Sequence, residues 1–383
     1  MNTEQVLFAL LRSVICGEKI SESVIAACTP ERLEGVYTLA AKHDLAHLVG
    51  QAVSKLPLPE SETLTKCKKA AMQAFARYML LDQAYQQICQ TLEKAEIPFI
   101  PLKGSVLRAY YPEPWMRTSC DIDVLVHPED LDAAVRVLTQ ELEYKYDRKD
   151  SHDVSLFTPR GVHIELHYDL IDCNPNTDPV LCHTWTTSAV KEGTRYYRCM
   201  TDEMFYFYHI AHMAKHFENG GCGIRPFLDL WILERKVDRD RQKRETLLAE
   251  GKLLTFARAA ETLVQVWFSS AKWDELSRQV NDYILQAGVY GNVRNQIAVY
   301  QAKQGGKLAY AMRRIFRPYD RMKHYYPILQ KHKWLLPAYQ VVRWFRVLFS
   351  GGAGNAVKEL QTNAEISSER VASTSKLLRR LGL

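Results

Sequence analysis

Two aspartates lie one residue apart in the apolar segment "DIDVLV". If this segment forms a strand, the side chains of Asp121 and Asp123 project from the same face. The apolar residues of the segment then face a core: Ile122, Val124 and Val126. Two carboxylates held side by side repel each other, and one of them tends to protonate. A divalent cation between them removes the repulsion and creates a positive site that suits a triphosphate.

A third carboxylate follows in "VHIELHYDL", where strand alternation places His163, Glu165 and His167 on one face. A neighbouring strand would bring Glu165 next to the two aspartates. Three carboxylates can hold two Mg²⁺ ions, which orient an attacking hydroxyl group and stabilise a leaving pyrophosphate. The predicted metal ligands and catalytic residues are therefore Asp121, Asp123 and Glu165.

The segment "LKGS" precedes the aspartates and indicates a turn between a strand and a helix over residues 105–111. Gly104 allows a ligand to approach the backbone, and Ser105 can cap the helix, whose first amide groups form an anion site. Lys103 and Arg117 are candidates for binding phosphate, and the arginine has the better fork-shaped geometry. A lone Gly-Ser can be an ordinary cap, so the order of these features along the chain carries the prediction.

A helix with the sequence "HIAHMAKHF" places His209, His212 and His216 on one face. A zinc site is one interpretation, but the i, i+4 histidine spacing with a carboxylate base is absent. Two others are packing with hydrogen bonding, and a cleft wall in which His212 and His216, together with His167, contact the nucleotide or its acceptor. Two residues of the next helix could pair with these histidines: Arg225 and Asp229.

The elements that position these residues follow from the spacing of apolar side chains. In the first part of the chain, apolar residues recur at helical spacing. Short strands and helices alternate in the next part, and apolar residues then return to helical spacing, with no further strand. This pattern predicts an α+β fold in which a small mixed sheet of four strands is flanked by N-terminal and C-terminal helical regions. The predicted regions are 1–96 (helical), 97–174 (α/β core), 175–302 (helical) and 303–383 (a basic, aromatic-rich helical tail with a flexible end).

The tail contains the apolar segment "WLLPAYQVVRWFRVLF". It is shorter than the ~20 residues that span a bilayer and is interrupted by polar residues, so we expect no transmembrane association. Peripheral membrane contact is an alternative, but a packed amphipathic helix is favoured. The basic and aromatic residues from Lys307 onwards could also bind RNA. We favour a helical hairpin whose cations face water and whose aromatic side chains face a core.

The composition limits where in the cell the protein can reside and which partners it can bind. A chain of 383 residues with 47% hydrophobic residues can bury more than one core, and a net charge of +6 permits an anionic partner without requiring one. The nine cysteines include no C-x-x-C pair and indicate reduced, buried thiols. No basic region precedes the first apolar stretch, which argues against a signal peptide. We therefore expect a cytoplasmic protein.

The succession of "LKGS", a spacer and "DIDVLV" resembles the signature of the DNA polymerase β-like nucleotidyltransferase superfamily. That signature is a glycine followed by glycine or serine, a spacer, an Asp-x-Asp strand and a later third acid. More narrowly, "IPFIPLKGSVLRAYYPEPWMRTSCDIDVLV", "IELHYDL" and "HIAHMAKHF" with "IRPFLDLWIL" resemble a bacterial family of uncharacterised nucleotidyltransferases.

This resemblance implies that Gly104 and Ser105 contact the triphosphate, that Asp121 and Asp123 bind metal, and that Glu165 is the third acid. The spacer from Ser105 to Asp121 is slightly longer than usual, and a bulged loop at "YPEPWMRTS" would absorb the difference. The implied activity is Mg²⁺-dependent transfer of a nucleoside monophosphate from a nucleoside triphosphate, with ATP expected, to a hydroxyl group, with release of pyrophosphate. The acceptor could be a small molecule, a protein or RNA. The alternative is a catalytically inactive nucleotide-binding or RNA-binding protein on the same fold.

Overall fold

The structure is a computed structural model that describes residues 1–170, 174–236, 240–289, 291–349 and 353–383. The chain divides into two compact units. The first unit comprises Met1–Ala214 and Gly223–Asn281, and the second comprises Lys215–Cys222 and Asp282–Leu383.

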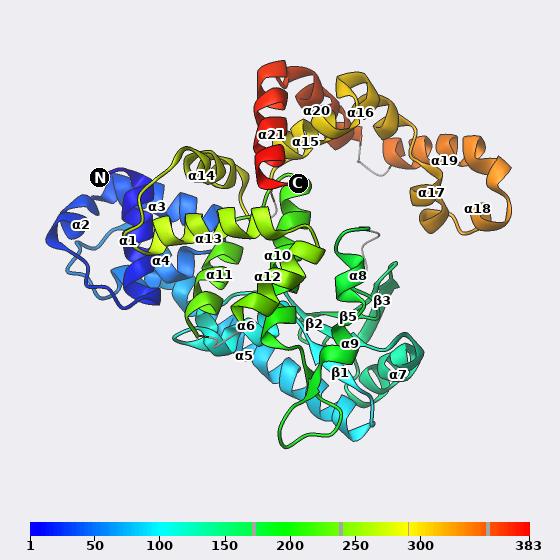
Figure 1. The fold of residues 1–383 in the computed structure, drawn as a ribbon, viewed down its shortest axis with the longest axis horizontal. Helices are drawn as coiled ribbons and strands as arrows, with labels where there is room; N and C mark the ends of the chain where they lie inside the picture. The colour runs from blue at the N-terminus through cyan, green and yellow to red at the C-terminus, as the bar shows by residue number, and fades with distance from the viewer. Residues whose placement is uncertain (171–173, 237–239, 290, 350–352) are drawn as a thin grey trace. The chain divides into compact units, whose positions relative to one another are not determined.

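The first unit begins with helices, as the spacing of its apolar residues predicts (blue to cyan in Figure 1). Their bounds are α1 (Thr3–Ile15), α2 (Glu22–Ala27), α3 (Pro30–Lys42), α4 (Ala46–Val53) and α5 (Glu62–Lys94). Side-chain caps fix where four of them begin, namely α1, α2, α3 and α5. Asn2 and Gln5 form a capping box at α1, and the Ser61 hydroxyl accepts a hydrogen bond from the backbone amide of Leu64 at α5.

A five-stranded mixed sheet follows, in the spatial order β1-β2-β5-β4-β3. Its strands are β1 (Phe99–Pro101), β2 (Asp121–Val126), β3 (Lys145–Lys149), β4 (Asp153–Phe157) and β5 (His163–His167). The β2–β5 pair is parallel, and the other three pairs are antiparallel. The predicted α+β class is confirmed, with one strand more than expected. The extra strand is β3, whose sequence "KYDRK" is exposed throughout and carries no apolar alternation.

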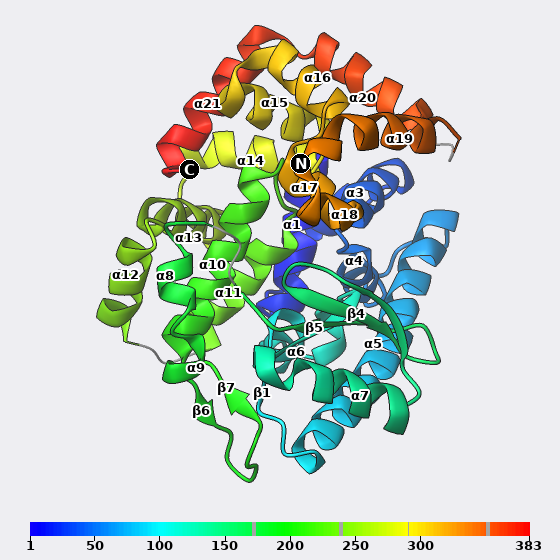
Figure 2. The same cartoon turned by 90° about the vertical axis from the view of Figure 1, so that its right-hand side faces the viewer.

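The two faces of the sheet differ in chemistry. Helices α5 and α7 (Leu131–Glu141) cover one face, as Figure 2 shows. The core on this face includes fully buried side chains of β2 and β5: Ile122, Val124, Ile164 and Leu166. Because side chains alternate along a strand, the carboxylates and histidines of β2 and β5 lie on the opposite face. The alternation predicted from the sequence is therefore confirmed.

The rest of the first unit is mainly helical. Its elements are α8 (Asp178–Leu181), α9 (Thr184–Thr187), β6 (Ala189–Val190), β7 (Arg198–Cys199), α10 (Asp202–Glu218), α11 (Arg225–Lys236), α12 (Arg241–Glu250), α13 (Leu254–Phe268) and α14 (Glu275–Ala287), of which α10 and α14 extend into the second unit. The expectation that no strand follows residue 174 is wrong, since β6 and β7 pair as an antiparallel ribbon. Two-residue strands are too short to show a sequence period.

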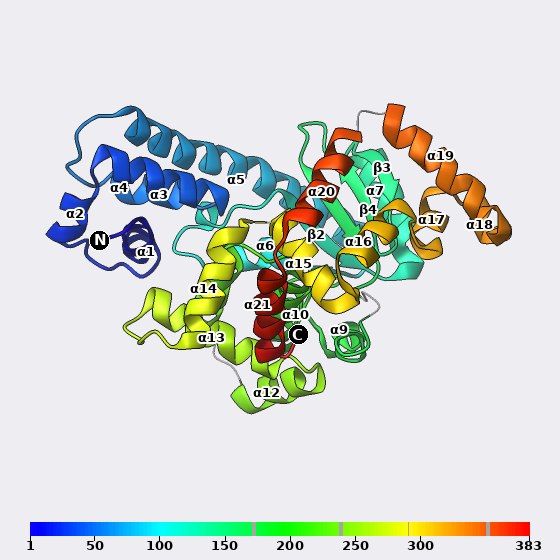
Figure 3. The same ribbon diagram turned by 90° about the horizontal axis from the view of Figure 1, so that it is seen from above.

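The second unit is built on α15, which contacts α16, α20 and α21, and these helices lie together in Figure 3. Its helices are α15 (Val293–Gln304), α16 (Gly306–Ile315), α17 (Tyr319–Tyr325), α18 (Ile328–Lys331), α19 (Leu336–Phe349), α20 (Ala353–Glu365) and α21 (Ser368–Leu381). The end of the tail, which was expected to be flexible, contains α21, a helix that is capped by Ser367 and buries Leu377 and Leu378. None of the described helices is both long enough and apolar enough to cross a membrane.

Helix α19 corrects a second expectation about the tail. The favoured hairpin would place its aromatic side chains in a core, but Trp334, Phe345 and Phe349 are exposed. The buried residue of α19 is instead the polar Gln340. The sequence predicts the amphipathic pattern, but the side of α19 that contacts the second unit is the polar one.

The expectation that the cysteines are buried holds for part of the set. The exposed ones are Cys16, Cys120, Cys182 and Cys199. Cys28, Cys67 and Cys222 are buried and Cys89 is half-buried, while Cys173 lies outside the described residues. No disulfide joins the described cysteines.

Candidate functional site

Three carboxylates, here called the acid cluster (Asp121, Asp123 and Glu165), meet across the parallel β2–β5 pair. The strand register places Asp123 opposite Glu165 and Asp121 opposite His163. Ligand atoms of Asp121, His163 and Glu165 lie within 4.8 Å of one another, and so do those of Asp123, Glu165 and His167. Glu165 therefore belongs to two adjacent groups of potential metal ligands.

Asp123 is the most buried member of the acid cluster, with 3% of its surface exposed. Its Oδ1 accepts hydrogen bonds from Lys103 Nζ at 2.9 Å and from His167 Nε2 at 3.0 Å. Burial alone would raise the pKa of Asp123, but the Lys103 ammonium and the His167 hydrogen bond outweigh it and hold the pKa well below its usual range. Burial is likewise outweighed at Lys103 and His167, whose pKa values are raised by Asp123. Asp123 is therefore ionised at neutral pH.

Asp121 has a different environment. Burial raises the pKa of Asp121, and the neighbouring Asp123 carboxylate raises it further. Within the described part of the chain, no ion pair engages the Asp121 carboxylate. Glu165 has only longer contacts, 3.5 Å to His167 Nε2 and 3.9 Å to His163 Nδ1. The acid cluster thus carries more negative charge than its near neighbours neutralise.

The "LKGS" turn differs from the helix expected over residues 105–111. Helix α6 spans Lys103–Leu107 and continues as a 3-10 turn, η1 (Arg108–Tyr110). Lys103 adopts a left-handed conformation with φ of 43°, which costs a non-glycine residue about 1–2 kcal/mol. The amide of Leu102 donates a hydrogen bond to the carbonyl oxygen of Asp123 at 3.0 Å. The turn is thereby fixed to β2, with the Lys103 ammonium on the Asp123 carboxylate.

Gly104 and Ser105 follow Lys103 in this turn. A Cβ atom on Gly104 would lie 3.3 Å from Ser119 Cβ, so the glycine lets the turn pack closely on the loop that precedes β2. The Ser105 hydroxyl is buried and has no hydrogen-bond partner among the described residues. An unsatisfied buried hydroxyl destabilises a protein, and a ligand oxygen can satisfy it. With five residues, α6 contributes little of the helix dipole that the expected anion site requires.

Arg117 lies inside the protein in the arginine cluster (Tyr111, Arg117 and Asp229). Asp229 Oδ1 accepts hydrogen bonds from Arg117 Nε at 2.7 Å and from the Tyr111 hydroxyl at 2.6 Å. Arg117 and Asp229 are 7% and 1% exposed. Burial alone would lower the pKa of Arg117, but the Asp229 carboxylate outweighs it and the pKa is raised. Where the sequence predicted a phosphate contact, the structure places a buried ion pair that ties the spacer loop to α11.

The spacer loop is held by side chains of the N-terminal helical region that the sequence did not identify. His47 Nε2 contacts the Met116 carbonyl oxygen at 2.8 Å, the Thr118 hydroxyl donates to Asp44 at 2.7 Å and Arg77 donates to the Ser119 carbonyl oxygen at 3.0 Å. Arg225, expected to pair with the histidines of α10, bonds to Asp44 instead, at 2.5 Å. The loop that delivers β2 is thus anchored on both sides.

The histidines of α10 do not act as one group. His209 is buried, and its Nε2 contacts the carbonyl oxygen of Pro226 at 2.9 Å. Burial lowers the pKa of His209. His212 is half-buried, with its ring 6.4 Å from that of Tyr208, and His216 belongs to the second unit. Among the described residues, the groups that could hold a metal do not include these histidines.

Further residues join the acid cluster that were not predicted as site residues. His163 lies with Asp121 and Glu165, and a separate group contains His152, Asp153 and His167. His163 could have been found from its alternation with Glu165. Asp153 could have been found from the antiparallel hairpin, which pairs it with His167.

The donor atoms of the acid cluster fit a divalent cation. Carboxylate oxygens are the ligands that Mg²⁺ prefers, and imidazole nitrogens extend the range to Mn²⁺ and Zn²⁺. A cation would also supply the positive charge in which the acid cluster is deficient.

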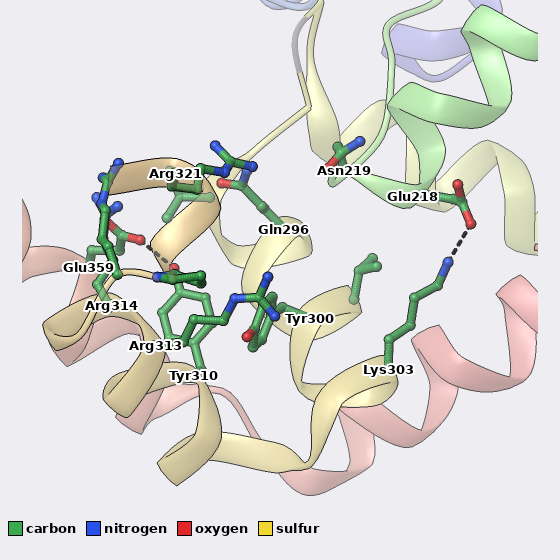
Figure 4. Close-up of a pocket in the computed structure, with 14 residues that line it drawn as sticks. Glu218, Asn219, Gln296, Tyr300, Lys303, Tyr310, Arg313, Arg314, Arg321 and Glu359 are labelled. Carbon is green, nitrogen blue, oxygen red and sulfur yellow. Dashed lines mark hydrogen bonds and ion pairs between the residues drawn. The ribbon is translucent and has the colours of Figure 1, made fainter. Parts of the chain in front are cut away.

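A basic pocket of about 610 Å³ lies within the second unit (Figure 4). Its cations are Lys303, Arg313, Arg314, Arg317 and Arg321. Lys303 is paired with Glu218, and Arg314 is paired with Glu359 at 2.5 Å. The ring of Tyr300 is engaged by Tyr310, at 5.0 Å between centroids, and by Arg313. The pocket therefore offers RNA some cations, but its aromatic rings contact protein groups already.

The chain belongs to a family described as uncharacterised nucleotidyltransferases, whose model matches residues 29–269, more than half of the sequence. The match contains the sheet, the spacer loop and the acid cluster. No curated protein and no solved structure matches the chain.

Proposed function

We propose that the protein is a Mg²⁺-dependent nucleotidyltransferase of the DNA polymerase β-like superfamily, in which the acid cluster binds metal and catalyses transfer. The observation that carries this proposal is the position of Glu165, which shares one group of ligand atoms with Asp121 and another with Asp123. Sites with two adjacent metals use such an arrangement to transfer phosphoryl groups. Membership of a nucleotidyltransferase family supports the same chemistry.

The acid cluster would hold two Mg²⁺ ions, which supply positive charge to the phosphoryl oxygens and to the leaving pyrophosphate. In the transfer itself, the hydroxyl oxygen of the acceptor attacks the α-phosphorus of the nucleoside triphosphate. The bond between that phosphorus and the oxygen bridging to the β-phosphate breaks, and pyrophosphate leaves. The nucleoside monophosphate is then joined to the acceptor.

Glu165 is our assignment for the base that accepts the hydroxyl proton. Its side chain is 27% exposed and can be reached by an acceptor, whereas that of Asp123 is 4% exposed. Lys103 and His167 also lower the pKa of Asp123, which makes its carboxylate a weak base. Asp123 is thus better suited to hold a cation than to accept a proton.

We assign the triphosphate to the "LKGS" turn. Lys103 supplies positive charge beside the carboxylates, the Ser105 hydroxyl can donate to a phosphate oxygen, and Gly104 permits close packing of the turn. Contacts of the nucleotide or acceptor with His167 and His212, which lie in the same unit as the acid cluster, are further parts of the proposal. ATP is the proposed nucleotide, and the acceptor is a small molecule, a protein or RNA.

An activity assay tests the proposal. Purified protein is incubated with Mg²⁺ and each α-labelled nucleoside triphosphate, with and without cell extract as a source of acceptor. We expect label transfer and pyrophosphate release that are lost in Asp121→Asn and Glu165→Gln. Asp147→Asn is the matched control, since Asp147 is an exposed acid on β3 of the same sheet. Absence of transfer and of pyrophosphate release under all conditions contradicts the proposal, and nucleotide binding without turnover would favour the inactive alternative.

A further inference from the structure

Helix α19 exposes its apolar side and contacts the rest of the second unit through its opposite side. Five of its apolar side chains are exposed: Val341 (43%), Val342 (49%), Phe345 (57%), Leu348 (61%) and Phe349 (86%). Their positions, i, i+1, i+4, i+7 and i+8, place them on one face of the helix, here called the apolar stripe. Surface helices of globular proteins normally bury this face.

The opposite side of α19 is fixed to the second unit by polar contacts. Gln340 is 6% exposed, accepts a hydrogen bond from the amide of Arg317 at 3.2 Å and donates one to its carbonyl oxygen at 2.5 Å. Trp344 Nε1 donates to the carbonyl oxygen of Ile315 at 2.8 Å, and Arg343 donates to the same oxygen at 2.5 Å. Rotation of the helix to bury the stripe would break these hydrogen bonds.

The chain around α19 is uniformly basic. No aspartate or glutamate occurs from Arg321 to Lys358, whereas lysine and arginine occur seven times. Three of these cations are exposed on α19 or just before it: Lys331, Lys333 and Arg346. Trp334, at the beginning of the same segment, is 76% exposed. An apolar face with tryptophan, phenylalanine and flanking cations is the composition of helices that lie in the membrane interface.

An apolar hollow of about 470 Å³ adjoins the stripe. Leu348 of the stripe lines it, together with Ile315 and Leu360 and the cations Arg317 and Arg343. Cations beside an apolar hollow match a ligand that carries both a phosphate group and hydrocarbon.

We propose that α19 is an interfacial helix that docks the protein on an anionic phospholipid surface. The apolar stripe enters the boundary between headgroups and acyl chains, and Lys331, Lys333 and Arg346 contact lipid phosphates. A second copy of the chain is a poorer occupant, because it would bring two basic surfaces together. RNA would bind the cations but would leave the stripe in water. The inference concerns binding and stands apart from nucleotidyl transfer.

Vesicle co-sedimentation of the full chain tests the stripe. The vesicles are pure phosphatidylcholine, or equal parts of phosphatidylcholine and phosphatidylglycerol. We expect binding to the anionic vesicles that falls at least about tenfold in Phe345→Ser/Phe349→Ser. Both phenylalanines are exposed, so circular dichroism should show an unchanged fold. Met72→Ser is the matched control, because Met72 is 73% exposed on α5 and should leave binding unchanged.

A charge series tests the lipid headgroup. Replacing Lys331, Lys333 and Arg346 by glutamine should weaken binding to anionic vesicles about fivefold for each cation. Added salt should weaken wild-type binding as well.

Three results would overturn the proposal. The first is equal vesicle binding by the double phenylalanine variant and the wild type. The second is a dimer in solution that the same substitutions abolish, which would make the stripe an interface between copies of this chain. The third is that the wild-type protein does not bind vesicles while the double phenylalanine variant binds RNA.

Discussion

The arginine cluster and the acid cluster lie in the same unit, and both bury ionised groups. They differ in how far their positive and negative charges balance. In the arginine cluster the buried guanidinium of Arg117 meets the buried carboxylate of Asp229 at 2.7 Å. In the acid cluster three carboxylates share the ammonium of Lys103 and two histidines. The first arrangement stabilises the fold, and the second is left short of positive charge. Sites that bind ligands are often held in such a destabilised state by the surrounding structure.

The largest expected effect is the loss of activity when the acid cluster is changed. Asp121→Asn removes a proposed metal ligand with almost no change in shape. We expect the initial rate of label transfer to fall on the order of 10³-fold, about 4 kcal/mol of transition-state stabilisation. Asp147→Asn should retain the wild-type rate, and a similar loss in that control would show that the effect is not specific to the acid cluster.

The next largest effect is the loss of stability when the arginine cluster is changed. Asp229→Asn leaves the Arg117 guanidinium buried without its counter-ion, so the free energy of unfolding should fall by about 3 kcal/mol. Urea denaturation followed by circular dichroism measures the change. Asp150→Asn, at an exposed acid that pairs with Arg148, is the control. A loss below that of the control would mean that the buried pair does not stabilise the fold.

A smaller effect involves two buried histidines next to the arginine cluster and its loop. Burial lowers the pKa values of His47 and His209, so the folded protein resists their protonation. Below the ordinary histidine pKa of about 6.5 the unfolded chain binds these protons more readily than the folded one, so stability is lost as the pH falls. We expect about 1 kcal/mol per histidine between about pH 7.5 and about pH 5.5. His47→Gln/His209→Gln should reduce this dependence, and an unchanged dependence would show that other groups cause it.

The smallest effect has the opposite sign at the acid cluster. Without added metal, Asp121→Asn removes repulsion between neighbouring carboxylates. The free energy of unfolding of the variant should therefore be about 1 kcal/mol higher than that of the wild type. Thermal denaturation in the presence of a chelator measures it. A destabilised variant would mean that the acid cluster, like the arginine cluster, contributes to the stability of the fold.

The sequence was sufficient where the signal was local. Strand alternation predicted that Asp121 and Asp123 share a face and that Glu165 faces the same way, and the parallel register brings them together. It was insufficient where the partner is distant. The arginine of the spacer loop resembled a phosphate ligand, and its actual partner, Asp229, follows 112 residues later on another helix.

In the tail, too, the sequence could not predict which side chains are buried, because their partners are distant. The sequence of α19 revealed an apolar face, but which face contacts the protein depends on Gln340 and on the backbone of Arg317, which no periodicity encodes. The edge strand β3 was missed because an exposed strand has no need for apolar alternation.

Crystals grown with Mn²⁺ and a non-hydrolysable nucleoside triphosphate analogue test the central claim most directly, through the anomalous scattering of manganese. We expect anomalous peaks from manganese ions bound by the carboxylate oxygens of Asp121, Asp123 and Glu165, with the triphosphate at the "LKGS" turn. Absence of manganese at these carboxylates, with the nucleotide bound elsewhere or not at all, would contradict it.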